Sequence, residues 1–451
     1  MNKLATKSSP KQRSQVSPAR LAAFEILRRV AEGGYASVLL AARAEELEPR
    51  DRALCHELVM GVLRFQLWLD VAIEHFAARS IEQLDLPVKL ALRLGLYQIR
   101  FLARVPESAA VNESVNLTHA ARVRSAGNFV NAVLRRAIRE TTYDPAAGLN
   151  DPIERLSVST SHPHWLIRRW DRLFGAREAE ALATANNQRA PLAFRVVHVE
   201  DSAAVLEQLR ESGALLEPSQ IADGAWRIQG AGKLALELAR SGKIYFQDEA
   251  SQLVAKIVAP DPGDAVLDIC AAPGSKASQI AAAPAVRIIA SDKHLHRIKT
   301  VREVFQSHDL ANGSCLVLDG ESSLPFRKGS FERVLVDAPC TGTGTLRHNP
   351  EIRWRISAPD ILELSNRQRQ ILTEASHVVK PGGHLIYSTC SVEPEENEEV
   401  VSAFIQCSPN FETAQLATTK EKFITATGAA RTWPHRDDTD GFFIAAFTRK
   451  R

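Results

Sequence analysis

The stretch Arg333-Val-Leu-Val-Asp-Ala-Pro-Cys340 is an apolar run that ends in a carboxylate and a thiol. Its aliphatic and β-branched residues favour a buried strand. Four further apolar runs, separated by helical stretches, lie around it in the chain: Ala265–Asp268, Arg287–Asp292, Cys315–Asp319 and His384–Tyr387. Short apolar strands that alternate with helices predict a largely parallel sheet with helices on both faces. Residues 242–451 are therefore predicted to form an α/β, Rossmann-like domain.

One connecting helix of this domain has clear limits in the sequence. Ser357 and Pro359 are typical of a helix start, and apolar residues follow at helical spacing from Ile361 to Val378. The breaker Pro381-Gly-Gly383 is predicted to end this helix.

Two different patterns precede the α/β domain, so we expect a multidomain chain. In residues 17–142 apolar side chains recur at helical spacing, as from Leu21 to Val30, and predict an all-α bundle. Residues 143–241 begin with linker helices and continue with short alternating strands, which predicts a small α+β module. Residues 1–16 are polar and basic and predict a disordered tail.

Composition narrows the class of protein. The 451 residues carry a net charge of +3, but residues 1–140 hold 21 Lys/Arg against 14 Asp/Glu by count. A basic amino-terminal part fits RNA binding, and a solvated helical surface explains it equally well. The six cysteines are scattered, which argues against a disulfide framework or a zinc site. With no signal peptide and no membrane-length apolar run, we expect a cytoplasmic monomer without a metal.

Polar side chains stand at the predicted carboxyl ends of the strands. They are Asp268, Asp292, Asp319, Asp337 and Cys390. A single aspartate at a strand end often only caps the next helix, but a row of them in a doubly wound domain indicates a ligand, because ligands bind at this edge of such sheets.

The first strand leads into Cys270-Ala-Ala-Pro-Gly-Ser-Lys276, whose small residues let a ligand approach the backbone. Helix amino-terminal N–H groups there would suit a carboxylate. The turn is neither Gly-x-Gly-x-x-Gly nor a phosphate-binding loop, which argues against a dinucleotide or ATP. Asp292, 24 residues beyond Asp268, is placed to hold a ribose diol. A ligand with a ribose and a carboxylate but no phosphate fits S-adenosylmethionine.

Two thiols at strand ends indicate covalent chemistry. A thiolate can attack C6 of a pyrimidine, so that C5 takes a methyl group from a sulfonium, after which a base must remove the C5 proton. Asp337 is placed to bond N3 of the ring and stabilise the developing charge. The alternative is that the cysteines are small buried hydrophobes, which suits Cys55, Cys315 and Cys407 and, less clearly, Cys270. The residues alone leave open which of Cys340 and Cys390 attacks.

Three motifs resemble those of the RNA (cytosine-5) methyltransferases. They are Cys270-Ala-Ala-Pro-Gly-Ser-Lys276, Asp337-Ala-Pro-Cys-Thr-Gly-Thr-Gly344, and Ser388-Thr-Cys-Ser391 with Glu393-Pro-Glu-Glu-Asn397. The helical amino-terminal domain resembles NusB, an RNA-binding antitermination factor. Together they resemble the RsmB/Sun (Fmu) family, which methylates a cytosine in 16S ribosomal RNA. Ser275 departs from the family's usual glycine, and the neighbours of Asp319 also differ.

The resemblance implies roles for individual residues. Cys390 would be the nucleophile, Cys340 would assist breakdown of the adduct, and Asp337 would act beside them. S-adenosylmethionine would be bound by Cys270, Ala271, Ala272, Pro273, Gly274, Ser275, Lys276, Asp292, Asp319 and Asp337.

We therefore expect methyl transfer to C5 of a cytosine in 16S rRNA through a covalent bond to C6. The alternatives are the same chemistry on tRNA or another RNA, and a non-catalytic RNA-binding protein with a degenerate methyltransferase fold. The target cytosine must be single-stranded or extruded, because stacking in an RNA duplex covers C5 and C6 of its ring. A basic cluster is either an RNA contact or a solvated helix face: Arg122, Arg124, Arg135, Arg136 and Arg139.

Overall fold

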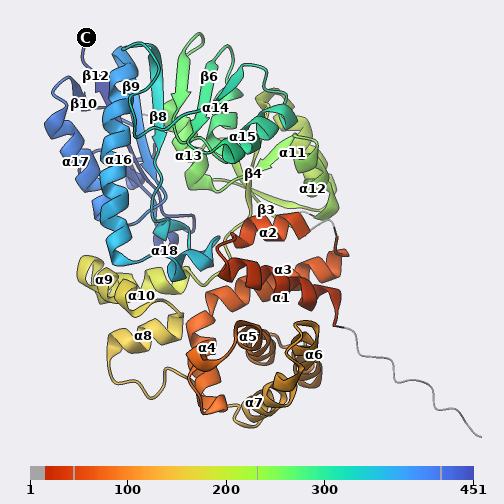
Figure 1. The fold of residues 1–451 in the computed structure, drawn as a ribbon. Coiled ribbons are helices and arrows are strands. Elements are labelled where there is room, and N and C mark those ends of the chain that lie inside the picture. The colour runs from red at the N-terminus through yellow and green to blue at the C-terminus, as the bar shows by residue number, and fades with distance from the viewer. Residues whose placement is uncertain (1–15, 44–45, 231, 417–418) are drawn as a thin grey trace, which may run out of the picture. The chain divides into compact units, whose positions relative to one another are not determined.

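The computed structural model describes residues 16–43, 46–230, 232–416 and 419–451. The chain forms two compact units, coloured along the sequence in Figure 1. The first unit holds the chain up to Ala183 together with Asn349–Glu351, and the second holds Thr184–His348 with Ile352–Arg451. Of the segment predicted to be a disordered tail, residues 1–15 lie outside the described residues.

The first unit is helical, as predicted. Its helices are α1 (Pro18–Ala31), α2 (Ala36–Arg43), α3 (Pro49–Arg64), α4 (Gln66–Ala77), α5 (Leu86–Phe101), α6 (Glu107–Ala120), α7 (Gly127–Arg139), α8 (Pro152–Thr160) and α9 (His164–Phe174), and α10 (Ala176–Ala185) spans the boundary at Ala183. Pro49 begins α3 because its missing N–H costs nothing at a helix start. A Cβ on Gly61 of α3 would lie 1.9 Å from the Tyr97 ring of α5, so only glycine allows this approach. No described helix is long and apolar enough to cross a membrane.

The second unit begins with a small antiparallel sheet in the order β2-β3-β1-β4. Its elements are β1 (Ala193–Val196), α11 (Ser202–Glu211), β2 (Leu215–Pro218), β3 (Ala225–Gln229), α12 (Gly232–Arg240) and β4 (Ile244–Phe246). Phe194, Leu209 and Ile244 are fully buried and form the core between this sheet and its helices. The α+β module predicted from the alternating strands is confirmed.

The large sheet of the second unit has the order β10-β12-β9-β8-β5-β6-β7, and a short strand, β11, pairs with β12. Its strands are β5 (Ala265–Asp268), β6 (Arg287–Asp292), β7 (Gly313–Val317), β8 (Phe331–Asp337), β9 (Val379–Thr389), β10 (Phe411–Thr413), β11 (Ala430–Arg431) and β12 (Phe443–Arg449). β5 to β9 are parallel, whereas β12 is antiparallel to β9 and β10 to β12. β7 ends at Val317, so Asp319 lies two residues beyond the strand instead of ending it.

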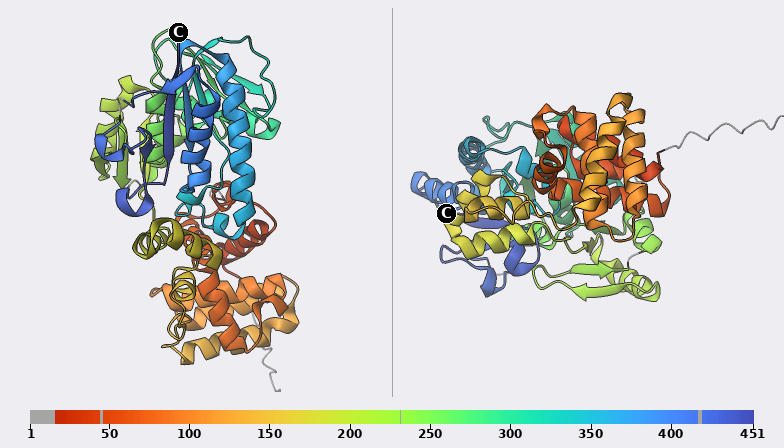
Figure 2. Two further views of the ribbon diagram at one scale, coloured as in Figure 1. Left: turned by 90° about the vertical axis from the view of Figure 1, so that its left-hand side faces the viewer. Right: turned by 90° about the horizontal axis from the view of Figure 1, so that it is seen from below.

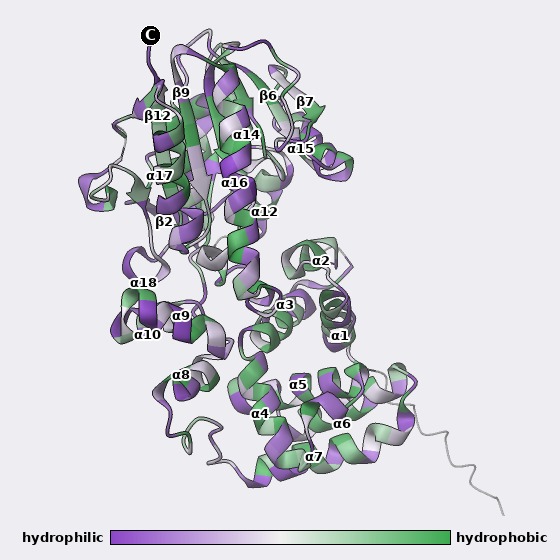
Figure 3. Cartoon of the chain, turned by 60° about the vertical axis from the view of Figure 1, so that its left-hand side comes forward, coloured by the Kyte–Doolittle hydropathy of each residue, from purple (hydrophilic) through white to green (hydrophobic). Residues whose placement is uncertain are grey.

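Helices cover both faces of this sheet (Figures 1 and 2). Successive buried residues of β8 show the alternation, because Leu335 packs in one core and Val334 and Val336 pack in the other. The first core contains α13 (Glu249–Val258), α14 (Ser275–Ala281) and α15 (Leu295–Ser307), and the second contains α16 (Ala358–Val378) and α17 (Glu398–Cys407). Strands buried on both faces are rich in hydrophobic residues, and Figure 3 shows green segments along the strands of this sheet between paler and purple ones.

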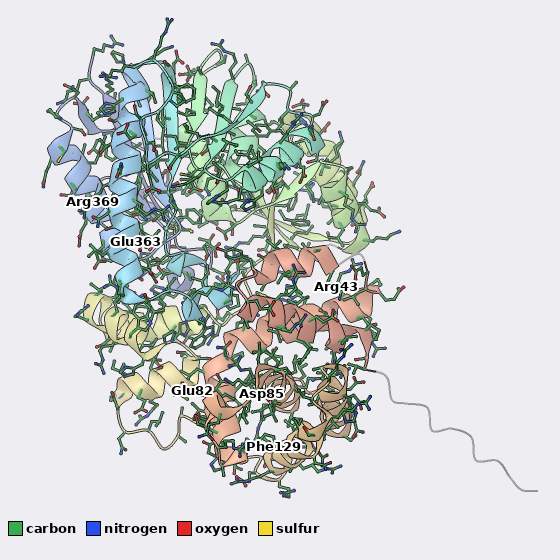
Figure 4. The ribbon with its side chains drawn as sticks, in the orientation of Figure 1. Arg43, Glu82, Asp85, Phe129, Glu363 and Arg369 are labelled. Carbon is green, nitrogen blue, oxygen red and sulfur yellow. The ribbon has the colours of Figure 1, made fainter. Side chains whose placement is uncertain are left out.

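α16 has the capping box expected from the sequence, in which the side chains of Ser357 and Asp360 bond each other's backbone N–H groups. The helix ends at Val378, and β9 follows at once, so the predicted end at Pro381 is wrong by three residues. Figure 4 labels Glu363 and Arg369 along this helix.

Chain order and sheet order diverge at β5. β6 pairs with one side of β5 and β8 pairs with the other, so the connections on the two sides of β5 run in opposite directions. In doubly wound sheets this topological switch point opens a crevice at the carboxyl edge, where ligands bind.

Candidate active site

Two thiols meet beside this edge of the sheet. Cys340 follows β8 by three residues, and Cys390 comes directly after β9, the parallel neighbour of β8. Their Sγ atoms are 3.3 Å apart, and both side chains are half-buried. The fold therefore brings together the two cysteines that the sequence singled out.

The loop that carries Cys340 is held by backbone contacts. The Gly344 N–H donates to the Cys390 carbonyl over 2.9 Å, and the Gly441 N–H donates to the Gly344 carbonyl over 2.8 Å. A Cβ on Gly344 would lie 2.0 Å from the Gly441 carbonyl oxygen. Gly344 therefore lets the chain pass between Cys390 and the segment that leads into β12.

Asp337, the last residue of β8, is held by two side chains. Its Oδ2 accepts a hydrogen bond of 2.7 Å from Lys276 Nζ, and its Oδ1 accepts one of 2.7 Å from Ser388 Oγ. Burial alone would lower the pKa of Lys276, but Asp337 outweighs it, and the pKa is raised, with a smaller contribution from Cys390. Lys276 thus stays charged and interacts electrostatically with Cys390.

The thiol of Cys340 is hard to ionise. Its hydrogen bond with Cys390 and then its burial raise the pKa of Cys340 well above the usual value. The cysteines expected to be buried hydrophobes differ among themselves: Cys55 is buried, Cys270 and Cys315 are half-buried, and Cys407 is exposed at the end of α17, where the expectation is wrong.

Asp268 ends β5 and is fully buried, and neither carboxylate oxygen meets a donor among the described residues at hydrogen-bond distance and angle. Burial, and then the neighbouring Asp337, raise the pKa of Asp268 well above its usual value. A buried carboxyl group without a donor is unusual and fits a ligand that brings its own. The α-ammonium group of S-adenosylmethionine is such a donor.

The remaining predicted cofactor residues border the same crevice. The loop from Cys270 to Lys276 joins β5 to α14, and Gly274 within it has φ +109°, which favours glycine. Asp292 ends β6, is buried, and accepts from the His294 N–H and the Arg297 guanidinium. Carboxylate oxygens retain further lone pairs for a ribose diol.

Asp319 is the most exposed of the three predicted aspartate ligands. It lies beyond β7 and pairs with Lys293 over 2.8 Å, which lowers the pKa of this carboxyl group. Because β7 stops earlier than expected, Asp319 stands in the following loop and not at the strand end.

One further group of side chains has metal-ligand chemistry. Asp248, His348 and Asp440 place one ligand atom each within 4.8 Å of one another. His348 Nδ1 is already 2.9 Å from Asp440 Oδ1, and Asp440, opposed by the burial of the ring, raises the pKa of His348 to about 9. In this structure the imidazole of His348 therefore pairs with the carboxylate of Asp440.

Sequence reasoning missed the carboxylate behind the two thiols. Glu396 is buried and accepts hydrogen bonds from the residues that follow Cys340 and Cys390. It lies in a motif that the sequence displays, but an acid near a strand end gives no sign of being buried until the fold is known.

The fold and site define a class of protein, namely an α/β domain of the nucleotide-binding type with two neighbouring thiols beside the carboxyl edge of its sheet. Family models then match three parts of the chain. Residues 255–448 match 16S rRNA methyltransferase RsmB/F, residues 17–139 match the NusB family, and residues 162–235 match the ferredoxin-like domain of the RsmF/B-like methyltransferases.

Relatives extend over nearly the whole chain. The probable ribosomal RNA small subunit methyltransferase B of Bacillus subtilis is 32% identical over 428 residues, covering 92% of this chain and 95% of its own. The ribosomal RNA small subunit methyltransferase B of Pseudomonas putida is 34% identical, covering 88% and 91%. The crystal structure of PH0851 is 26% identical, with a TM-score of 0.83 over 98% of this chain and 100% of that one.

The chain therefore belongs to the RsmB/F family of 16S rRNA methyltransferases. The resemblance drawn from the three motifs and the NusB-like helices is confirmed, and S-adenosylmethionine is the cofactor.

Proposed function

We propose that this enzyme transfers a methyl group from S-adenosylmethionine to C5 of a cytosine in 16S rRNA, through a covalent bond between Cys390 Sγ and C6 of the ring. The observation that carries the proposal is the 3.3 Å separation of the Cys340 and Cys390 sulfurs at the ends of neighbouring parallel strands. One thiol forms the adduct, and the second lies within reach of the same ring.

The electrostatics favour Cys390 as the nucleophile. Lys276 stays charged and interacts electrostatically with Cys390. Cys340, by contrast, is kept as a neutral thiol mainly by its hydrogen bond to Cys390. The cofactor supplies a methyl group activated on a sulfonium, close to the C5 carbon that becomes electron-rich when Cys390 bonds to C6.

The same contacts explain a later role for Cys340. Once Cys390 is a thioether, it no longer shares a proton with Cys340, and the largest cause of the raised Cys340 pKa is gone. Cys340 then gives its own proton to water more readily and, as a thiolate, accepts the C5 proton. The electron pair of that C–H bond reforms the ring double bond, and the C6–Sγ bond breaks to release Cys390.

Asp337 has two tasks in this proposal. It holds Lys276 and Ser388 through its two oxygens, which keep lone pairs for a bond to a protonated N3 of the ring. The proposed cofactor contacts are the residues from Cys270 to Lys276, together with Asp292, Asp319 and Asp337. The unpartnered carboxyl group of Asp268 would receive the α-ammonium group.

The amino-terminal unit would contact the RNA backbone. Four arginines of the basic cluster are exposed, namely Arg122, Arg124, Arg135 and Arg139. Arg136 is instead half-buried and pairs with Glu140 over 2.7 Å, so it is structural. We propose that a monomer acts on this RNA in the cytoplasm.

The substrate is tested with purified enzyme and methyl-labelled cofactor. Deproteinised 16S rRNA should accept label as 5-methylcytosine, and total tRNA should not. Label transferred only to tRNA would overturn the proposed substrate but not the chemistry, and label in a product other than 5-methylcytosine would overturn the chemistry.

A further inference from the structure

A single buried carboxylate links the segments that carry the two thiols. Glu396 lies in the short turn Pro394–Glu396 between β9 and α17, and it has no exposed surface. Its Oε1 accepts from the Thr341 N–H over 2.9 Å, and its Oε2 accepts from the Thr341 and Ser391 hydroxyls, each over 2.5 Å. Thr341 directly follows Cys340, and Ser391 directly follows Cys390. One side chain therefore holds both residues adjacent to the reactive sulfurs.

The carboxylate is itself fixed from behind. Gln368 of α16 donates to Glu396 Oε1 over 3.0 Å and to the Pro339 carbonyl, the residue before Cys340, over 2.8 Å. Tyr387 of β9 donates its hydroxyl to the Glu396 carbonyl over 2.5 Å. With partners on a helix, a strand and both loops, Glu396 has little freedom to move.

Hydrogen bonds to a charged acceptor in a buried site are strong, and removing the acceptor leaves several donors unsatisfied. The hydroxyls of Thr341 and Ser391 are also linked through the Glu396 oxygen that they share, and they lie 3.2 Å apart.

We propose that Glu396 is a positioning residue that sets the spacing of the Cys340 and Cys390 sulfurs. It touches neither sulfur nor the reacting base. Its importance for turnover rests on the proposed function, whereas its effect on the sulfur spacing does not. A disulfide needs both sulfurs to approach in a defined geometry, so its rate of formation reports the spacing without RNA or cofactor. Because the Glu396 charge also raises the pKa of Cys340, each rate is measured over a range of pH and compared at equal thiolate fraction.

The test uses diamide, an oxidant whose N=N bond takes up the two hydrogens lost when two thiols join. Tryptic peptides are separated by mass spectrometry, so that the Cys340–Cys390 bond is scored apart from other pairs. Wild-type enzyme should form this bond readily. Glu396→Ala should form it about ten-fold more slowly, because several buried hydrogen bonds are lost.

Two further variants distinguish an effect on the spacing of the two sulfurs from an effect on folding. Glu396→Gln keeps the length of the side chain and one carbonyl acceptor, so it should fall between wild type and Glu396→Ala. Glu399→Gln removes the same charge three residues later, on an exposed side chain, and should oxidise as wild type does. Thermal unfolding of each variant identifies any that fail to fold, and Glu396→Gln then carries the test.

The outcomes separate the two claims. Slow disulfide formation in Glu396→Gln, with a reduced kcat and an unchanged KM for rRNA, supports positioning. A folded Glu396→Gln and Glu396→Ala that both oxidise at the wild-type rate would overturn it, as would a wild-type enzyme that forms no such bond. If the variants oxidise slowly while wild type makes no 5-methylcytosine, positioning stands and the proposed function fails.

Discussion

Lys276 Nζ donates a 2.7 Å hydrogen bond to Asp337 Oδ2, which joins the first turn of α14 to the end of β8 at the switch point of the sheet. Both side chains are largely withdrawn from solvent, at 10% and 24% exposure. The pair therefore connects the segment proposed to bind the cofactor with the loop that carries Cys340.

We expect strong energetic coupling within this pair. Asp337→Asn leaves a buried ammonium without its counter-charge and should lower the free energy of unfolding by about 3 kcal/mol. The double variant Asp337→Asn/Lys276→Met should lose less free energy of unfolding than the two single variants lose together, by about 1–3 kcal/mol. Urea unfolding of the wild type, both single variants and the double variant measures this coupling free energy between Lys276 and Asp337. Strictly additive losses would contradict the pairing.

Gly344→Ala should damage both stability and activity. The new Cβ would lie 2.0 Å from the Gly441 carbonyl oxygen and 2.8 Å from that of Cys390, so backbone must move. Such overpacking costs about 1–3 kcal/mol, and the displaced loop carries Cys340. Gly148→Ala is the control, since nothing lies within 4 Å of its added Cβ. Equal unfolding midpoints for the two variants would show that the contact is not tight.

Stability should fall in mildly alkaline solution. The folded-state pKa of His348 is raised from 6.5 to about 9, first by Asp440, so folding favours its charged form. That contribution is fully present below pH 6.5 and is lost as the pH rises through about 9. Burial raises the pKa of Asp248 to about 7, so this acid is about half ionised at pH 7 and almost fully ionised at pH 9.

The measurement is the free energy of unfolding between pH 7 and pH 9.5. Wild type should lose stability over this range, and His348→Gln should start lower and stay flatter. Parallel curves for the two proteins would mean that His348 does not titrate with folding.

Cys390→Ala should abolish methyl transfer to rRNA, because it removes the thiol proposed to attack C6. Cys407→Ala, which changes an exposed cysteine at the end of α17, should retain wild-type activity. Filter binding of labelled methyl groups measures both. Substantial turnover by Cys390→Ala would contradict the proposal that Cys390 is the nucleophile.

The sequence predicts the limits of a strand correctly where the local run of apolar residues coincides with the segment that pairs in the sheet. β5 and β6 begin and end as predicted, because each apolar run is bounded by polar residues and terminates in an aspartate. β7 is displaced by two residues, since Leu318 continues the apolar run after pairing with β6 has ended. The antiparallel strands β10 and β12 were not anticipated, because their pairing depends on the distant β9.

Some residues of the site could likewise be predicted from the sequence, and others could not. Cys340 and Cys390 could be predicted as neighbours because each follows a strand, and parallel strands end at one edge. Glu396, Gln368 and Thr341 could not, since their contacts join residues 28 and 55 positions apart and form only when α16 and β9 pack together.

The most direct test of the account is the trapping of the covalent intermediate. Cys340→Ala should lack the group that completes release, so incubation with rRNA and S-adenosylmethionine should yield a protein–RNA adduct, visible as a shifted band on a denaturing gel. Nuclease and protease digestion, followed by mass spectrometry, should find the modified cytosine on Cys390. An adduct formed by Cys390→Ala but not by Cys340→Ala would reverse the two roles, and no adduct with either variant would contradict covalent catalysis.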